Sequence, residues 1–352
     1  MLSSDVKQNS LKKHHFNIKP RYIVFILLFV FSWILFGLNY SNADYENYEA
    51  AYNDIKYGRE NDYFEIGFFA LIKLSAALGL SYQVFLVIIS AVCLFIFTKA
   101  LSYLTNNLAL SFACYLIYPF VFDVVQYRNF LAFAFVLFGL HYLLDNNSKT
   151  VKNVLKYFLF VVLGSLFHLS VIIYSLFFLV IIKRTRILAV VTAVLFAIIV
   201  FLIINQEILV NLLLLLHLDR FARYTFDYAY STFFQYCAVY LFFLFLAVLK
   251  FKNNMQSAKF KFLIISSLFL PFIIMNGTSA RFIRNVFIIF YAFLLDYKCK
   301  KLSEISMQQI FIAVALIASI TFVFYNQLCS GLYYDIVLKP VLQCNWLFRK
   351  YF

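Results

Sequence analysis

The sequence has 352 residues, of which 64% are hydrophobic and only 13% are charged, and its formal net charge is +14. A soluble domain has about a quarter of its residues charged, so this composition excludes a globule that is stable in water. Nor does the positive charge indicate nucleic-acid binding, because the Lys and Arg residues lie in short segments between apolar blocks and not on one basic face.

The apolar blocks have the character of membrane spans. Backbone groups in lipid need hydrogen bonds within the segment, so we predict that these blocks are helices. The first block is too long for the core of a signal peptide and has no small-residue cleavage site after it, so we expect a retained helix. In chain order, the predicted spans are 22–39, 82–98, 108–122, 129–144, 154–166, 168–182, 187–204, 232–249, 262–275, 282–296 and 309–325.

One weaker apolar segment, 64–80, decides the topology. It is interrupted by Glu65, Lys73 and Gly79. If this segment does not cross and the N-terminus is inside, most of the 30 Lys and Arg residues fall on the inner side and most of the 16 acidic residues on the outer side. If it does cross, the basic loops 183–186, 250–261 and 298–301 all face outward, against the positive-inside rule.

The sequence therefore predicts an all-α, polytopic transmembrane bundle with eleven spans and one re-entrant or interfacial helix at 64–80. The whole chain, 1–352, is one transmembrane domain, with its N-terminus inside and its C-terminus outside. Its outer parts are the loops 40–63 and 205–231 and the C-terminal tail 326–352.

Polar residues gather at the predicted outer face. In the first loop, Asp44, Tyr45, Tyr48 and Tyr52 have the spacing of one helix face, and Arg59 and Glu65 follow. The alternative is a solvated interfacial helix. Arg128 lies in a tight outer turn, where the alternative is an arginine that reaches to the interface. His168 interrupts the uncharged run from Tyr157 to Ile182, and we expect it at the turn of a helical hairpin.

Arg281 and Arg284 open the span 282–296 and lie three residues apart, on the same helix face. Guanidinium groups bind phosphate in a bidentate manner, and helix N-termini also favour anions. This pair predicts a phosphate or diphosphate ligand, the alternative being a lipid head group. Another outer loop adds Arg220 and Tyr224. We find no sequence motif for a nucleotide, a metal or another cofactor, and expect none.

These motifs, in this order, resemble the EpsG-like family of polysaccharide polymerases, which is related to many Wzy O-antigen and capsule polymerases. The resemblance covers most of the chain. One departure is Asn129, where the family pattern has glutamine. The stretches that carry the resemblance are Asp44-Tyr45 with Tyr48 and Tyr52, Asp62 to Phe68, Gln126 to Ala132, Phe167 to Ser170, Arg220 with Tyr224, and Arg281 with Arg284.

The resemblance implies a glycosyltransferase that moves a growing glycan from one polyprenyl-diphosphate carrier to a lipid-linked repeat unit. The reaction would take place at the outer face of a bacterial inner membrane, in lipopolysaccharide, capsule or exopolysaccharide synthesis. Its partners would be the lipid-linked donor and acceptor and the membrane lipids, and a chain-length regulator is a further candidate partner. The alternatives are a transporter or flippase for a lipid-linked saccharide, which would carry polar residues deep in its spans, and a membrane acyltransferase.

Under this hypothesis, Arg128, Arg281 and Arg284 stabilise the leaving diphosphate. Asp44 and His168 are candidates for the base that accepts the proton of the attacking hydroxyl, with Glu65 as a further candidate. The remaining residues, which would hold the second carrier or the sugar, are Arg59, Arg220 and Tyr224.

Overall fold

The computed structural model describes residues 20–59, 64–144, 151–215, 228–297, 304–329 and 333–347. Within these ranges the protein is helical and has no strand, which confirms the all-α prediction. The first half of the chain contains α1 (Pro20–Gly37), α2 (Tyr45–Lys56), α3 (Ile66–Ala77), α4 (Tyr82–Leu104), α5 (Leu108–Ile117), α6 (Phe120–Val125), α7 (Tyr127–Leu144) and α8 (Val151–Ser165).

The second half continues with shorter 3₁₀ and π segments among the helices. These elements are η1 (Leu169–Ile181), α9 (Thr185–Ile204), α10 (Gln206–Leu215), α12 (Tyr230–Phe251), α13 (Ala258–Ile265), η2 (Ser266–Phe269), α14 (Phe272–Met275), η3 (Gly277–Ser279), α15 (Ala280–Leu294), α16 (Met307–Phe324), η5 (Tyr325–Cys329), η6 (Tyr334–Leu338) and α17 (Lys339–Gln343).

Six helical segments of the described chain are long and apolar enough to cross a membrane: Tyr82–Leu104, Tyr127–Leu144, Thr185–Ile204, Tyr230–Phe251, Ala258–Met275 and Met307–Cys329. Shorter apolar helices accompany them, among them Tyr22–Gly37 and Leu169–Ile181. Each predicted span coincides with one or more of these helical elements. A polytopic membrane protein is therefore the fold of this chain, while the number of spans and their orientation remain predictions.

Two predicted spans are broken by proline. The block 108–122 consists of α5 and α6, and Pro119 lies between them. The block 262–275 changes from α13 through η2 to α14, and Pro271 precedes α14. Proline has no N–H to donate and restricts the residue before it, so a continuous helix cannot pass through either position without losing a hydrogen bond.

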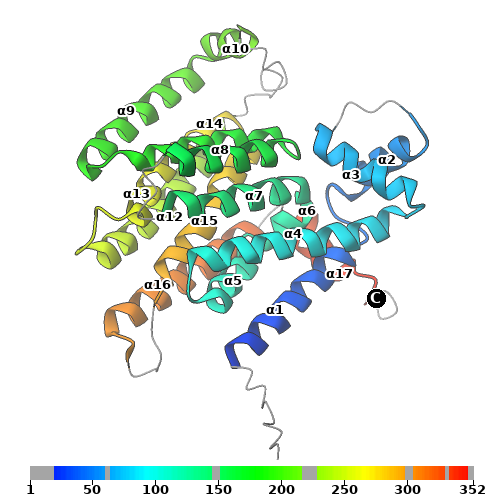
Figure 1. Ribbon diagram of the computed structural model, residues 1–352, viewed down its shortest axis with the longest axis horizontal. Coiled ribbons are helices and arrows are strands. Elements are labelled where there is room, and N and C mark those ends of the chain that lie inside the picture. The colour runs from blue at the N-terminus through cyan, green and yellow to red at the C-terminus, as the bar shows by residue number, and fades with distance from the viewer. Residues whose placement is uncertain are drawn as a thin grey trace, which may run out of the picture.

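The centre of the bundle is formed by α7 and α15, whose side chains are buried almost all round. In Figure 1, α4, α7 and α8 run side by side, and α15 lies behind them. By contrast, α9, α12 and α16 expose large apolar side chains, including Val190, Phe234 and Phe322. In a membrane protein such side chains face lipid, so α7 and α15 can carry polar groups that the outer helices shield.

The weak segment forms α3, and both ends of this helix lie at one end of the bundle. At its N-terminal end, the Glu65 carboxylate pairs with Arg128, near the start of α7. Just beyond its C-terminal end, α4 begins at Tyr82, whose hydroxyl lies 3.5 Å from that of Tyr127, the first residue of α7. With 12 residues, α3 is about 18 Å long. This length is shorter than the hydrocarbon core of a bilayer, about 30 Å, which is consistent with the predicted re-entrant or interfacial helix.

The C-terminal segment packs against the end of α1. The Asn345 amide donates a hydrogen bond to the Ile34 carbonyl over 2.8 Å, and the backbone N–H of Trp346 donates to Leu38 over 2.9 Å. Asn39 donates in turn to the carbonyl oxygens of Pro340 and Cys344, each over 3.0 Å. These bonds place α17 at the same end of the bundle as α2 and α3 (Figure 1).

Candidate functional site

Five helix N-termini converge at this end of the bundle. Asp44, Glu65 and His168 are the N-cap residues of α2, α3 and η1. Arg128 is the second residue of α7, and Arg281 is the second residue of α15. The N-terminus of a helix carries a partial positive charge and free N–H groups. The convergence therefore makes this a favourable place for an anion, even before the two arginines are counted.

The carboxylate of Glu65 connects three of these termini. Its Oε2 accepts a hydrogen bond from Nη1 of Arg128 over 3.1 Å. Its Oε1 accepts one from the backbone N–H of Leu169 over 3.1 Å and lies 3.7 Å from Nδ1 of His168. Both oxygens are thus engaged, and the side chains of Arg128, Glu65 and His168 are all largely buried. Glu65 holds the N-terminal ends of α3, α7 and η1 together.

His168 lies between Glu65 and Arg281. Its Nε2 is 3.5 Å from Nη1 of Arg281, and because a guanidinium can only donate, Nε2 must accept. The ring proton is then assigned to Nδ1, which faces Glu65 and, at 3.4 Å, Oγ of Ser170. Burial lowers the pKa of His168 well below its usual value, and the charges of Arg281 and Arg128 lower the pKa further. The imidazole is therefore neutral at physiological pH.

Asp44 supplies a second acid beside the same arginines. Burial raises the pKa of its carboxyl group, and the positive charges of Arg128 and Arg281 partly oppose this rise. Its backbone N–H is bonded to Asn42, but no described residue donates a hydrogen bond to its carboxylate. Asp44 therefore differs from Glu65, because its oxygens are not occupied by protein donors.

Arg128 is held by aromatic rings as well as by Glu65. Its guanidinium carbon lies 4.7 Å from the centre of the Phe64 ring and 5.6 Å from that of Tyr48, and Nε donates to the Tyr48 hydroxyl over 3.4 Å. Phe68 adds a third ring at 5.8 Å. Cation–π contacts of this kind stabilise a partly desolvated guanidinium. The sequence placed Tyr48 at this face, but the roles of Phe64 and Phe68 emerge only from the structure.

Arg284 occupies different surroundings from Arg281, although both begin α15. It is buried, stacks on Phe122 with 4.0 Å between its guanidinium carbon and the ring centre, and its Nη2 donates to Oε1 of Gln126 over 3.5 Å. Asp123 is also buried, and its Oδ2 has no hydrogen-bond partner in the described chain. The two arginines therefore have separate partners and do not form a single clamp in this structure.

Of the three remaining predicted residues, the structure describes one. Arg59 pairs with Asp54 over 3.1 Å at the surface, with 72% of the Arg59 side chain exposed, and so is not part of this cluster. Arg220 and Tyr224 lie outside the described residues. The structure thus assembles Asp44, Glu65, Arg128, His168 and Arg281 into one site, which we call the polar cluster, with Arg284 nearby in its own pocket.

A comparison with known protein families finds a match. The profile of the EpsG family matches residues 22–336, a range that includes the whole polar cluster. The chain belongs to the EpsG family. No curated protein matches it, and no solved structure does. Membership of the EpsG family is consistent with a polymerase role in polysaccharide synthesis, and the apolar helices place that role in a membrane.

Proposed function

We propose that this EpsG-family protein is a glycan polymerase of the bacterial inner membrane. It transfers a growing polysaccharide from one polyprenyl-diphosphate carrier to a lipid-linked repeat unit at the outer face. The observation that carries this proposal is the polar cluster, where two arginines, a neutral histidine and an unoccupied carboxylate meet at five helix N-termini. This arrangement suits a reaction that releases a diphosphate.

The reaction forms one bond and breaks another. A hydroxyl oxygen of the acceptor sugar attacks the anomeric carbon of the donor, and the bond from that carbon to the diphosphate breaks. The leaving diphosphate takes the electron pair, and the hydroxyl proton passes to a base. Arg281 and the helix N-termini stabilise the negative charge that develops on the leaving group. Because these groups are already in place, little reorganisation is needed as the bond breaks.

Asp44 is the group that we propose as the base. Its carboxylate is not held by a described protein donor, and its raised pKa makes it a better proton acceptor than an ordinary aspartate. Glu65 is less suited, because both of its oxygens are engaged by Arg128, His168 and Leu169. We assign to Glu65 the positioning of Arg128 and His168, and to His168 the positioning of Arg281.

Reconstitution tests the proposal. The purified protein in liposomes, given a synthetic polyprenyl-diphosphate repeat unit, is expected to produce a ladder of longer lipid-linked glycans. The absence of chain growth with a substrate that a known polymerase extends would contradict the proposal. Movement of the labelled repeat unit across the bilayer without chain growth would favour the flippase alternative.

A further inference from the structure

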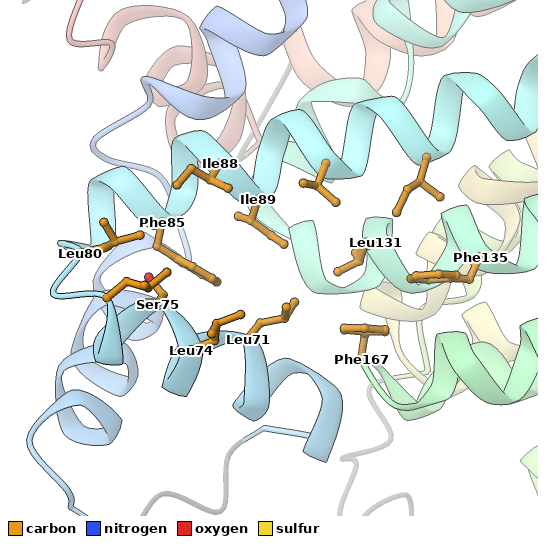
Figure 2. Close-up of a pocket in the computed structure, with 13 residues that line it drawn as sticks. Leu71, Leu74, Ser75, Leu80, Phe85, Ile88, Ile89, Leu131, Phe135 and Phe167 are labelled. Atoms are coloured by element: carbon orange, nitrogen blue, oxygen red, sulfur yellow. The ribbon is translucent and has the colours of Figure 1, made fainter.

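An apolar groove runs between α3, α4 and α7. It has a volume of about 310 Å³ and exposes no polar surface. Figure 2 shows Leu80, Phe85 and Ser75 at one end and Phe135 and Phe167 at the other. We call it the α3 groove, and its lining includes Leu71, Leu74, Ile88, Ile89, Leu131 and Phe167.

The α3 groove is open on its side. The side chains of Leu74 and Ile88 are 60% and 49% exposed, although they line the groove. In a bilayer such exposed leucine and isoleucine side chains face lipid. A hydrocarbon chain can therefore enter this groove laterally from the membrane.

A second groove lies between η1, α10, α14 and the start of α15, with a volume of about 240 Å³. We call it the α15 groove, and its lining includes Ser170, Ile172, Leu213, Phe272, Met275 and Arg281. It is apolar except near this arginine and two serines. Nε of Arg281 is buried without a hydrogen-bond partner in the described chain, so an anion at this point would supply an acceptor that the protein lacks.

The two grooves meet at one short segment. Phe167 lines the α3 groove, Ser170 lines the α15 groove, and His168 lies between these two residues. The polar cluster runs in the same direction, from Glu65 at the N-terminal end of α3 through His168 to Arg281 in the α15 groove. The polar cluster therefore borders both grooves, through His168 beside Phe167 and through Arg281 in the lining of the α15 groove.

The grooves differ in where they offer positive charge. The α15 groove contains Arg281, which contacts His168. The α3 groove has a lysine at its far end, where Nζ of Lys56 donates to the carbonyl of Leu80 over 2.9 Å. Leu80 and Phe167 lie at opposite ends of the groove (Figure 2). Leu80 is hydrogen-bonded to Ser75 and Leu166 to Gly67, and the part of α3 between Gly67 and Ser75 is about 12 Å long.

We infer that the two grooves hold the isoprenoid chains of two different lipid-linked substrates. The α15 groove takes the donor, whose diphosphate leaves at Arg281. The α3 groove takes the acceptor, whose diphosphate binds near Lys56 while its glycan reaches back to Asp44 and His168. This inference rests on the proposed function, since only a transfer between two carriers needs two lipid sites.

The separation of charges supports this assignment. The donor reacts at the sugar that bears the diphosphate, so its anion must lie at the reaction centre. The acceptor reacts at a hydroxyl that is one repeat unit away from its diphosphate, so its anion must lie at a distance. Arg281 lies where the donor diphosphate must be, and Lys56 lies where the acceptor diphosphate must be. Both side chains are cations and would attract these anions.

Tryptophan substitutions test the two sites separately. Ile88→Trp fills the α3 groove, and Val84→Trp is its control, since Val84 lies one helical turn away on α4, is similarly exposed and does not line the groove. Leu213→Trp fills the α15 groove. Its control is Leu212→Trp, since Leu212 is the adjacent residue and does not line the groove. Thermal unfolding in detergent shows whether each variant is folded.

The first readout is binding and needs no activity. Native mass spectrometry with sugar-free polyprenyl diphosphate is expected to show two bound lipids on the wild type and on both controls. Each groove variant is expected to bind one. One bound lipid on the wild type would overturn the inference, because there would then be a single site. Displacement of the polyprenyl diphosphate by an equal concentration of phosphatidic acid would also overturn it, because the grooves would then be general lipid contacts.

The second readout separates the donor from the acceptor. With a preformed oligomer as donor and a single repeat unit as acceptor, Leu213→Trp is expected to raise the KM of the donor about tenfold, and Ile88→Trp that of the acceptor by a similar factor. Equal effects of each variant on both substrates would contradict the assignment. Two bound lipids without any chain growth would instead contradict the proposed function and leave two lipid sites, so the two failures can be told apart.

Discussion

Nη1 of Arg281 lies 3.5 Å from Nε2 of His168, and this contact joins α15 to the turn between α8 and η1. It also assigns the proton of the imidazole to Nδ1, on the side of Glu65. The position of the Arg281 guanidinium thus depends on a neutral histidine. Each residue positions the side chain of the other, so the effect of substituting either one can be predicted.

Removing the His168 ring is expected to lower the rate of chain growth on the order of 100-fold, because Arg281 loses the acceptor that positions it. His168→Gln keeps an acceptor close to the place of Nε2 and is expected to retain more activity than His168→Ala. The measurement is the initial rate in liposomes with lipid-linked repeat units. His141→Ala, in α7 and away from the cluster, is the control. Equal loss in the Gln and Ala variants would contradict a positioning role.

The pH dependence of chain growth distinguishes Asp44 from His168. A base works when it is deprotonated, so the rate is expected to fall as the pH drops through the pKa of Asp44, which burial raises above 3.8. His168 has a pKa well below 6.5 and stays neutral, so no inflection near pH 6.5 is expected. Asp44→Asn is expected to lower the rate about 10²- to 10⁴-fold and to remove the acidic limb.

A pH profile of His168→Gln completes this test. Its acidic limb is expected to resemble that of the wild type, because the group that titrates is Asp44. An inflection near neutral pH that disappears in this variant would instead assign the base to His168. Binding of the sugar-free lipid to Asp44→Asn, measured alongside, shows whether the loss lies in the chemistry or in substrate affinity.

The pair of Arg128 and Glu65 is expected to stabilise the fold as well as the site. Their side chains are only 10% and 15% exposed, so either single change leaves a largely buried charge without its partner. Arg128→Met and Glu65→Gln are each expected to destabilise the protein. The double variant is expected to lose less stability than the two single variants lose together. A coupling energy of about 1–3 kcal/mol is expected from thermal unfolding in detergent. If the losses in stability of the two single variants simply added up in the double variant, the ion pair would contribute nothing to the stability of the fold.

The fold was predictable because hydrophobic blocks of span length leave few alternatives. The predicted spans agree with the helices at most of their ends. The weak segment 64–80 forms the short helix α3, and its position relative to the membrane stays a prediction. Where the chain departs from a simple span, the cause is local. Pro119 separates α5 from α6, and Pro271 precedes α14. Both prolines are visible in the sequence. The mean hydropathy of a block, however, does not reveal that one backbone N–H is missing.

The site was predictable in its residue types but not in its contacts. Short motifs identified Asp44, Glu65, Arg128, His168 and Arg281, yet their spacing in the chain does not say which groups touch. From the sequence, Glu65 ranks behind Asp44 and His168 as a candidate base, whereas the structure shows its carboxylate at the centre of the hydrogen bonds. The separation of Arg281 from Arg284 was also not predictable. Both lie on one helix face, but their long side chains reach different partners.

Reporter fusions test the orientation on which the functional proposal depends. Alkaline phosphatase is active only outside the inner membrane. A fusion after residue 330 is therefore expected to be active and one after Lys252 inactive. If the segment 64–80 crossed the membrane, both results would be reversed, and the polar cluster would face the cytoplasm. A short α3 with both ends at one end of the bundle predicts the first result.

Gly67 allows α3 to approach the turn before η1. Its backbone N–H donates to the Leu166 carbonyl over 2.8 Å, and a Cβ at position 67 would lie 2.8 Å from that same oxygen. Gly67→Ala therefore forces α3 away from the turn and moves Glu65 relative to His168. Chain growth is expected to fall at least tenfold, with a loss of about 1–3 kcal/mol in stability.

Gly277→Ala is the matched control for this change. Gly277 precedes α15, close to Arg281 in the chain, but the nearest atom to its added Cβ would be Cβ of Ala229 at 3.7 Å, an ordinary contact. This variant is expected to keep the activity and thermal stability of the wild type. If both variants were equally active, the close approach of α3 to the turn would be unnecessary for function. If both lost activity, the loss would reflect a general effect of the added methyl group, and the specific role of Gly67 would be contradicted.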